Sequence, residues 1–280
     1  MAIKLIAIDL DGTLLDSNRE LSDANKNAIQ AAKEKGVQVV LCTGRPLKAM
    51  THLLKEADLM GEEDIAITYN GGLIQKTKTG EIIHEMTLNR EESLDIYRLG
   101  EKLNLPVNFI DFNYIYEPRY PENVPSIYTK SHPKVPKKNA LSVKAIDIDH
   151  LEESFESYKI VMSRPAEELD AAIPNIPDDY HERYNIFKSQ DFILEVLPKK
   201  VDKGFSMRLL GEMLGLDKEE IMGIGDQEND LSLVENAGLG IAMGNAIDQV
   251  KEAADYISYS NDENGVAHVI QKFVLDEELL

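Results

Sequence analysis

The stretch IKLIAIDLDGTLL, residues 3–15, decides the fold of this 280-residue chain. Residues 3–8 are mostly apolar, which is typical of a strand that is buried on both faces of a parallel sheet. The strand ends at Asp9, and a second carboxylate, Asp11, follows one residue later. Because ligands of doubly wound sheets bind beyond the carboxyl ends of the strands, we expect both carboxylates to lie in a functional site.

Short apolar runs and helix signals alternate in the two end portions of the chain. Further strands are predicted at 37–41, 65–68, 221–224, 239–242 and 256–258, and a hairpin at 73–84. Helices are predicted at 23–35, 46–57, 203–214, 228–236 and 246–253, with a last helix from residue 265. Buried strands joined by helices indicate an α/β fold: a doubly wound, Rossmann-like parallel sheet with helices on both faces.

The middle of the chain has a different pattern. Its predicted strands lie in adjacent pairs, at 107–111, 114–117, 159–162, 184–188 and 192–196, and its helices at 90–103 and 165–173. Adjacent strands indicate an antiparallel sheet with helices on one face. We therefore expect an inserted α/β cap domain at 85–198, between core segments 1–84 and 199–280. Two linkers would carry this domain, which allows it to move as a lid.

Composition argues against several classes of partner. The formal charge of −20 disfavours nucleic acid and acidic lipid. No apolar run approaches the ~20 residues of a membrane span, and the N-terminal run is too short for a signal peptide. Cys42 is the single cysteine, so no internal disulfide is possible, as suits a reducing compartment. We expect a cytoplasmic protein with no nucleic-acid, membrane or protein partner.

Asp9 and Asp11 together suggest phosphoryl-transfer chemistry. Two carboxylates so close together are costly without a cation, and Mg²⁺ prefers hard oxygen ligands. Asp9 can bind the metal through one oxygen and attack phosphorus with the other, while Asp11 can protonate the leaving oxygen and then activate water. A surface turn is the alternative for this motif. The apolar run before it and the Thr13-Leu14-Leu15 sequence after it favour the site.

The segment Thr43-Gly44-Arg45-Pro46 follows a predicted strand and precedes a predicted helix. A hydroxyl and backbone amides at a helix start suit phosphate oxygens. The alternative is a helix N-cap by Thr43 with no ligand. A cysteine-dependent phosphatase would require an arginine six residues after Cys42, where the chain has Lys48. We therefore interpret Cys42 as a small core residue.

Lys203 stands at the start of a predicted helix, where the helix dipole disfavours a cation. This position suggests a compensating anion: the substrate phosphate, Asp9 or both. The alternative is an exposed lysine in a linker.

The segment 223–230 ends another buried strand and supplies more oxygen ligands. Asp226 closes the strand and Asp230 lies one helical turn later. With Asp9 they form an acidic cluster that needs a divalent ion. Asn229 offers an amide to the substrate or to a catalytic carboxylate. A calcium loop is the competing interpretation, but residues 231–233 do not supply the alternating ligands and distal glutamate that such a loop needs.

Taken together, four motifs occur in an order that resembles a known superfamily. They are DLDGTLL (9–15), TGRP (43–46), DKG (202–204) and GDQENDLSL (225–233). In this order they closely resemble the aspartate-nucleophile phosphatases of the haloacid dehalogenase superfamily. TYNGG (68–72) and GLGIAMGNA (238–246) resemble its Cof-type subfamily. The opening residues and IMGIGDQEND look most like the YidA-type sugar-phosphate phosphatases, whereas the cap matches mainly at its end.

The resemblance implies a role for each motif residue. Asp9 is the nucleophile, and Asp11 is the acid/base and lends its backbone carbonyl to Mg²⁺. The implied phosphate or substrate ligands are Thr43, Gly44, Arg45, Lys203 and Asn229. The implied metal ligands are Asp9, Asp11, Asp226 and Asp230, the last directly or through water. All of these residues are present, which favours an active enzyme.

The resemblance also implies that the cap selects the leaving group and that the substrate is a small phosphorylated metabolite, most simply a sugar phosphate. Candidate core contacts to the organic part are Arg45, Asn70 and Gly71-Gly72. Polar cap residues near expected loop tips are Asn113, Tyr116, His132 and Lys188, and an ordinary structural role is favoured for each.

Three alternatives to a sugar phosphatase stay open. The same chemistry can act on pyridoxal phosphate or on flavin- or nucleotide-type phosphates. A non-enzymatic sugar-phosphate sensor is a second alternative, although the presence of Asp9, Asp11 and Lys203 disfavours it. The third is a phosphomutase, which would have to protect an aspartyl phosphate from water and hold a bisphosphate.

Overall fold

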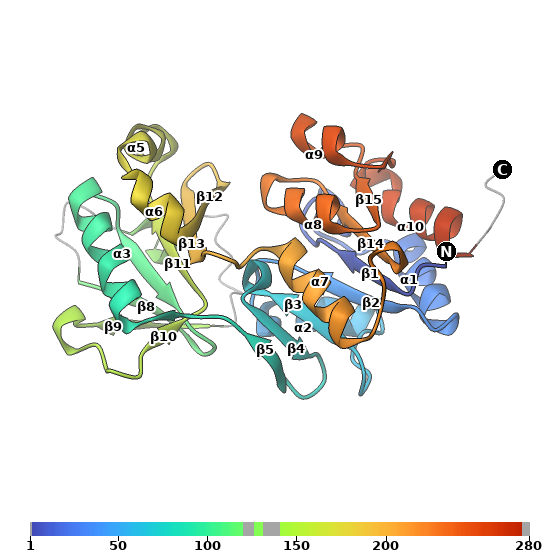
Figure 1. Ribbon diagram of the computed structural model, residues 1–280, viewed down its shortest axis with the longest axis horizontal. Coiled ribbons are helices and arrows are strands. Elements are labelled where there is room, and N and C mark those ends of the chain that lie inside the picture. Colours follow the sequence, from blue (N-terminus) through green and yellow to red (C-terminus); the bar gives the residue numbers. More distant parts are fainter. Residues whose placement is uncertain (1, 120–125, 131–140, 276–280) are drawn as a thin grey trace. The chain divides into compact units, whose positions relative to one another are not determined.

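The computed structural model describes residues 2–119, 126–130 and 141–275 (Figure 1). The chain divides into two compact units. Unit 1 combines the residues up to Glu85 with those from Asp202 onward, and unit 2 spans Met86–Val201. The sequence places the corresponding boundaries after residues 84 and 198.

Unit 1 is built on an eight-stranded sheet in the order β16-β15-β14-β1-β2-β3-β4-β5. Its strands are β1 (Leu5–Ile8), β2 (Gln38–Cys42), β3 (Ile65–Thr68), β4 (Leu73–Lys76), β5 (Ile82–Glu85), β14 (Ile221–Gly225), β15 (Leu239–Ala242) and β16 (Tyr256–Ile257). Strands from β16 to β3 pair in parallel, and β4 and β5 add an antiparallel hairpin. The predicted doubly wound parallel sheet and the hairpin are confirmed.

Helices cover both faces of this sheet because successive strand residues point to opposite sides. Ile6 and Ile8 pack into a core with α1 (Asp23–Glu34), α2 (Leu47–Glu56), α9 (Asp248–Ala253) and α10 (Gly265–Ile270). Leu5 and Ala7 face the other core, with α7 (Lys203–Met213) and Leu233 of α8 (Leu231–Asn236). Within the described ranges, no helix has the length and apolar composition needed to cross a bilayer.

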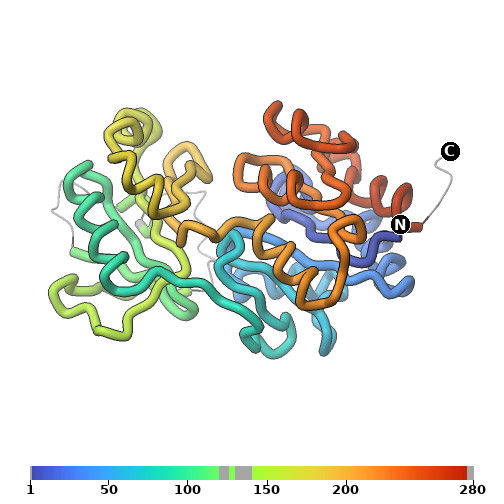
Figure 2. Tube along the Cα trace, viewed as in Figure 1, coloured from blue at the N-terminus to red at the C-terminus, as the bar shows by residue number. Residues whose placement is uncertain are grey.

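The first strand of the chain and a strand of its C-terminal portion lie side by side near the centre of the sheet. Figure 2 shows the N-terminal strand, in blue, beside C-terminal segments in orange. β1 pairs with β14 in parallel, with Leu5 opposite Ile221 and Ile8 opposite Ile224. Because both strands run the same way, the residues that follow them lie at the same edge of the sheet.

Three predicted helix starts in unit 1 differ from the structure. The helix predicted from residue 246 begins at Asp248. Pro46 is the N-cap of α2 and not part of its first turn. The helix predicted at 228–236 is a 3₁₀ turn, Glu228–Asp230, followed by α8. The turn is tighter because the Asp230 carboxylate folds back and accepts backbone hydrogen bonds from Asp226 and Gln227.

Unit 2 contains a six-stranded sheet in the order β12-β13-β11-β7-β8-β9. Its strands are β7 (Val107–Ile110), β8 (Tyr114–Pro118), β9 (Ser142–Ile146), β11 (Lys159–Ser163), β12 (Tyr184–Gln190) and β13 (Ile193–Pro198). The pairs among the predicted strands are antiparallel, as expected, and the strand that was not predicted, β9, pairs with β8 in parallel. β9 was not predicted because it is an exposed edge strand without a buried face.

The helices of unit 2 pack mainly on one face of its sheet. The apolar residues of that face, such as Phe109, Ile160 and Leu194, form a core with α3 (Arg90–Leu103) and α5 (Ala166–Ala172). The short helix α4 (Ile127–Lys130) departs from the prediction of helices on one face. Its Tyr128 backbone amide donates to the Ser163 hydroxyl. Successive residues of β11 point to opposite faces, and Met162 belongs to the apolar face, so α4 lies on the other face of the sheet. A second sheet has two strands, β6 (Leu88–Asn89) and β10 (Glu156–Ser157).

Candidate active site

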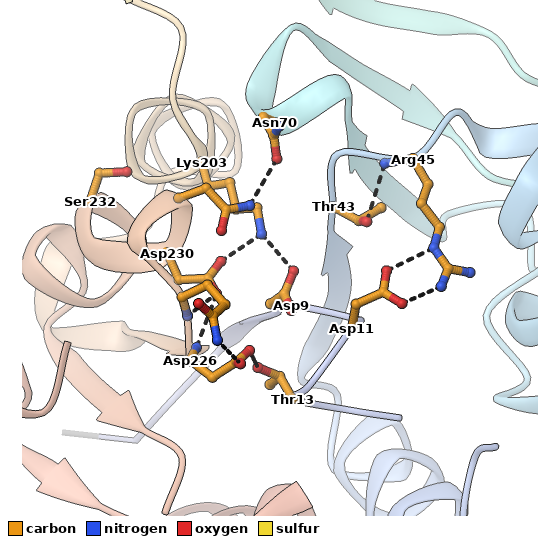
Figure 3. A network of polar contacts seen from close by, with 12 residues as sticks. Asp9, Asp11, Thr13, Thr43, Arg45, Asn70, Lys203, Asp226, Asp230 and Ser232 are labelled. Carbon is orange, nitrogen blue, oxygen red and sulfur yellow. Dashed lines mark hydrogen bonds and ion pairs between the residues drawn. The ribbon is translucent and has the colours of Figure 1, made fainter. Parts of the chain in front are cut away.

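The site is built where β1 and β14 end. Asp9 directly follows β1 and Asp226 directly follows β14, and the Asp9 amide donates to the Ile224 carbonyl at 3.0 Å. With Asp230 they form a buried cluster in which one carboxylate oxygen from each residue lies within 4.8 Å of the others (Figure 3). Parallel pairing of two strands that are far apart in sequence therefore brings the expected acidic residues together.

Lys203 is the cation at the centre of this cluster. It is the first residue of α7, and its side chain is fully buried. Its Nζ donates to Asp9 Oδ1 at 2.5 Å and to Asp230 Oδ1 at 2.5 Å (Figure 3). Burial alone lowers the Lys203 pKa, but the carboxylates of Asp230 and Asp9 outweigh this effect and hold the pKa above its usual value. The two carboxylates also offset the unfavourable helix dipole.

The cluster contains more negative charge than Lys203 can neutralise. Burial, followed by repulsion from Asp230, raises the Asp9 pKa well above its ordinary value, although Lys203 lowers it. Burial and Asp230 likewise raise the pKa of Asp226 to about 6. Three buried carboxylates around one ammonium group suit a divalent cation, and their oxygens are the ligands that Mg²⁺ prefers. The residues present therefore fit the expected metal.

Asp230 has hydrogen-bond donors on both carboxylate oxygens. Oδ1 accepts from Lys203, and Oδ2 accepts from the backbone amides of Asp226 and Gln227 at 3.0 and 3.1 Å. The Asp230 carboxylate therefore orients the ammonium group and the turn that carries Asp226.

The loop after Asp9 passes close to Asp226. Gly12 has φ +88°, and a Cβ at this position would lie 2.5 Å from Asp226 Oδ2. Both facts require glycine here. Thr13 donates its hydroxyl to Asp226 Oδ1 at 2.7 Å, and Gln227 donates its side-chain amide to Asp226 Oδ2 at 3.1 Å. The sequence led to no predicted role for Thr13 or Gln227. Their positions inside the motifs at 9–15 and 225–233 were the signal that could have identified them.

Asp11 does not join the buried carboxylate cluster. Its carboxylate is partly exposed and forms a two-point ion pair with Arg45, whose Nε lies 2.8 Å from Asp11 Oδ2 and whose second contact joins Nη2 to Oδ1 (Figure 3). The cluster thus contains the carboxylates of three of the four expected metal ligands: Asp9, Asp226 and Asp230.

Thr43 lies directly after β2 and is buried. It does not cap α2, so that alternative is wrong: the N-cap is Pro46, and Thr43 Oγ1 accepts from the Arg45 amide at 3.2 Å. The Thr43 amide donates to Ile67, which anchors this turn to β3. Gly44 lies against Asn70, so that a Cβ at Gly44 would be 2.9 Å from Asn70 Nδ2.

The other candidate residues are also accounted for. Asn229 donates its side-chain amide to Asn70 Oδ1 at 3.2 Å. Cys42 is fully buried, and burial raises its thiol pKa, so the thiolate that a cysteine mechanism needs is disfavoured. In unit 2, Tyr116 donates to Asp111 and Lys188 to Asp170. The remaining cap candidates are Asn113, whose backbone amide donates to Asp111, and His132, which lies outside the described residues.

Comparison with known proteins identifies the family. Residues 6–270 match the family model of haloacid dehalogenase-like hydrolases. A Bacillus subtilis (strain 168) protein named "Putative phosphatase YxeH" is 38% identical over 272 residues, covering 97% of this chain and 98% of that protein. The 5-amino-6-(5-phospho-D-ribitylamino)uracil phosphatase YcsE of the same organism is 32% identical, covering 98% of this chain and 96% of the relative.

A solved structure extends the likeness to the fold. The subclass IIB sugar phosphatase BT4131 superposes with a TM-score of 0.77 at 26% identity, covering 96% of this chain and 98% of the other. The match spans both units, and the expected superfamily is confirmed. The chain therefore belongs to the haloacid dehalogenase-like hydrolases and is a phosphatase.

Proposed function

We propose that this phosphatase hydrolyses small phosphate monoesters, with sugar phosphates as its preferred class, through a Mg²⁺-dependent reaction in which Asp9 is phosphorylated. The observation that carries the proposal is the buried contact of Lys203 with Asp9 inside a cluster of three carboxylates. This arrangement places a cation beside an oxygen nucleophile, as the transfer of an anionic phosphoryl group requires.

Magnesium would be held by carboxylate oxygens of Asp9 and Asp226, together with the backbone carbonyl of Asp11. When bound, it supplies positive charge that offsets the charge of the phosphoryl group. Asp230 acts as a positioning residue, because both of its oxygens already accept hydrogen bonds from Lys203 and the 226–227 backbone.

The reaction has two steps. In the first, a carboxylate oxygen of Asp9 attacks phosphorus, the bond to the leaving oxygen breaks, and Asp11 gives that oxygen its proton. Lys203, the Thr43 hydroxyl and the Gly44 amide hold the phosphoryl oxygens. In the second step, Asp11 takes a proton from water, which attacks the aspartyl phosphate and releases inorganic phosphate and free Asp9. In the structure both Asp11 oxygens accept from Arg45, and this ion pair favours the charged form, so Asp11 acts as the acid only after it leaves the pair and takes up a proton.

The comparisons support two substrate classes to different degrees. The relative BT4131 is named as a sugar phosphatase, which favours sugar phosphates. The relative YcsE is named for a ribitylaminouracil phosphate and matches over nearly the whole chain, so a flavin-precursor phosphate is the second candidate.

The test is phosphate release from a panel of sugar phosphates, pyridoxal phosphate, flavin mononucleotide, nucleotides and 5-amino-6-(5-phospho-D-ribitylamino)uracil, with Mg²⁺ and with chelator. We expect metal-dependent turnover that is highest for the sugar phosphates. Turnover confined to the ribitylaminouracil phosphate would move the proposal to the second candidate. Full activity in chelator would contradict the role of Mg²⁺.

Magnesium is expected to raise the unfolding temperature more at about pH 8 than at about pH 5, because metal and protons compete for the same carboxylates. The Asp226 pKa of about 6 lies above its ordinary value, so the folded state binds this proton more tightly than the unfolded state. Without metal, this carboxyl group therefore lowers stability progressively as the pH rises from about 4 to about 6.

Thermal unfolding with Mg²⁺ and with chelator at both pH values measures this difference. Asp226→Asn is the control and should respond less to the metal, since it removes one carboxylate ligand. An equal metal-induced shift at both pH values would contradict the carboxylate site.

A further inference from the structure

The turn after β3 has an unusual backbone. Tyr69 and Asn70 have φ values of +54° and +56°, and Gly71 has φ +105°, so three consecutive residues occupy positive φ. Residues with a Cβ rarely adopt this conformation, because it is sterically strained for them. Backbone strain of this kind persists only where the surroundings impose it.

Asn70 is held by two segments of the candidate active site. Its side chain is buried, and Oδ1 accepts the Asn229 amide at 3.2 Å. Its backbone amide donates to the Thr43 carbonyl at 3.0 Å. Its side-chain amide lies so close to Gly44 that an added Cβ would be 2.9 Å from Nδ2. Asn70 therefore joins the turn after β2 to the turn after β14.

Gly71 attaches the same turn to a third segment. A Cβ at Gly71 would lie 2.3 Å from the Asp202 carbonyl oxygen, and Ser206 donates its hydroxyl to the Gly71 carbonyl at 2.6 Å. Asp202 is the N-cap of α7, the helix that begins with Lys203. The Tyr69-Asn70-Gly71 turn thus contacts three segments of the candidate active site: the turn after β2, the turn after β14 and the start of α7.

We propose that Asn70 is a positioning residue for phosphoryl transfer, which fixes the Asn229 amide and the Gly44 backbone relative to Asp9. The inference rests on the proposed function. A replacement that removes the Asn70 amide leaves Lys203 and the acidic cluster in place but releases Asn229 and Gly44. Misplacement of groups by about 1 Å is enough to reduce a rate on the order of 100-fold.

Asn70→Gly separates this role from folding. Glycine adopts positive φ without strain, so the turn is retained while the amide is lost. We expect kcat to fall on the order of 30- to 100-fold with KM changed by less than about threefold, because Lys203 still binds the phosphate. The matched control is Asn104→Gly: Asn104 has the same backbone conformation, φ +57° and ψ +36°, at the end of α3 in unit 2.

A double-mutant cycle tests whether Asn70 acts through Asn229. If it does, Asn70→Gly combined with Asn229→Ala should lose little more activity than the more damaging single variant. Gly44→Ala displaces the Asn70 amide without altering residues 69–71 and should lower kcat in the same range. Gly44→Ala keeps the backbone amide that holds a phosphoryl oxygen, and the three atoms nearest to the added Cβ all belong to Asn70. A fall in kcat with little change in KM therefore reports the displacement of Asn70, even if Asn70→Gly does not fold.

Two results would overturn the inference: Asn70→Gly with kcat within about twofold of the wild type, or losses at Asn70 and Asn229 that multiply as independent effects. Wild-type protein is measured in the same assay with Mg²⁺. Its failure to release phosphate from any ester in the panel would count against the proposed function. The results at Asn70 count against the inference only if the wild-type protein releases phosphate in this assay.

Discussion

Asp9→Asn is expected to abolish phosphate release while the protein stays folded. The amide oxygen is not a nucleophile for phosphorus, so the first step cannot start. Losses of roughly 10⁴-fold or more follow when a reacting group of this kind is removed. Folding is retained because a negative charge is unfavourable at this position: burial and Asp230 raise the Asp9 pKa. The substitution removes that charge. Phosphate release and thermal unfolding, each with Mg²⁺, measure the two effects.

Asp23→Asn is the control for this variant, because the Asp23 side chain is 93% exposed and makes only a surface ion pair. It should keep wild-type activity. Purified Asp9→Asn with wild-type turnover would refute the aspartyl-phosphate mechanism.

Lys203→Met is expected to lose both activity and stability. Methionine has a similar length and can occupy the buried position, but it leaves Asp9 and Asp230 without their shared cation. Breaking a buried ion pair by removing one partner costs about 3–5 kcal/mol. Activity falls as well, because no ammonium group then faces the phosphoryl oxygens.

The stability loss in Lys203→Met should depend on pH. Lys203 lowers the Asp9 pKa, so without the ammonium group this pKa rises further above its ordinary value and lies above that of the unfolded chain. The folded variant then binds protons more tightly than the unfolded chain, and its stability falls as the pH rises. In chelator, urea unfolding at about pH 8 should therefore show a larger deficit relative to wild type than at about pH 5.

Lys78→Met provides the comparison, since Lys78 pairs with Glu62 at the surface and both side chains are at least half exposed. Such pairs contribute little to stability. An equal stability loss for the two lysine variants would argue against a central role for Lys203 in the cluster.

Much of unit 1 could be predicted because its strands are short, buried and bounded by turn residues. β1, β3 and β15 are such runs, and their burial on both faces makes them recognisable from composition alone. Unit 2 was harder to predict. β9 is an exposed edge strand with no buried face, and α4 has only four residues, so neither has the burial or the length by which an element is recognised from sequence.

The sequence by itself determined which residues end the strands and which chemistry they carry. Asp9 and Asp226 follow buried apolar runs, and Lys203 opens a helix, because these are local properties of neighbouring residues. Only the tertiary structure decided which partner each side chain meets. Lys203 contacts a carboxylate 194 positions away, Asp11 pairs with Arg45, and Asn70 meets Asn229. Such contacts depend on how the helices pack onto the sheet, and a local pattern does not encode that geometry.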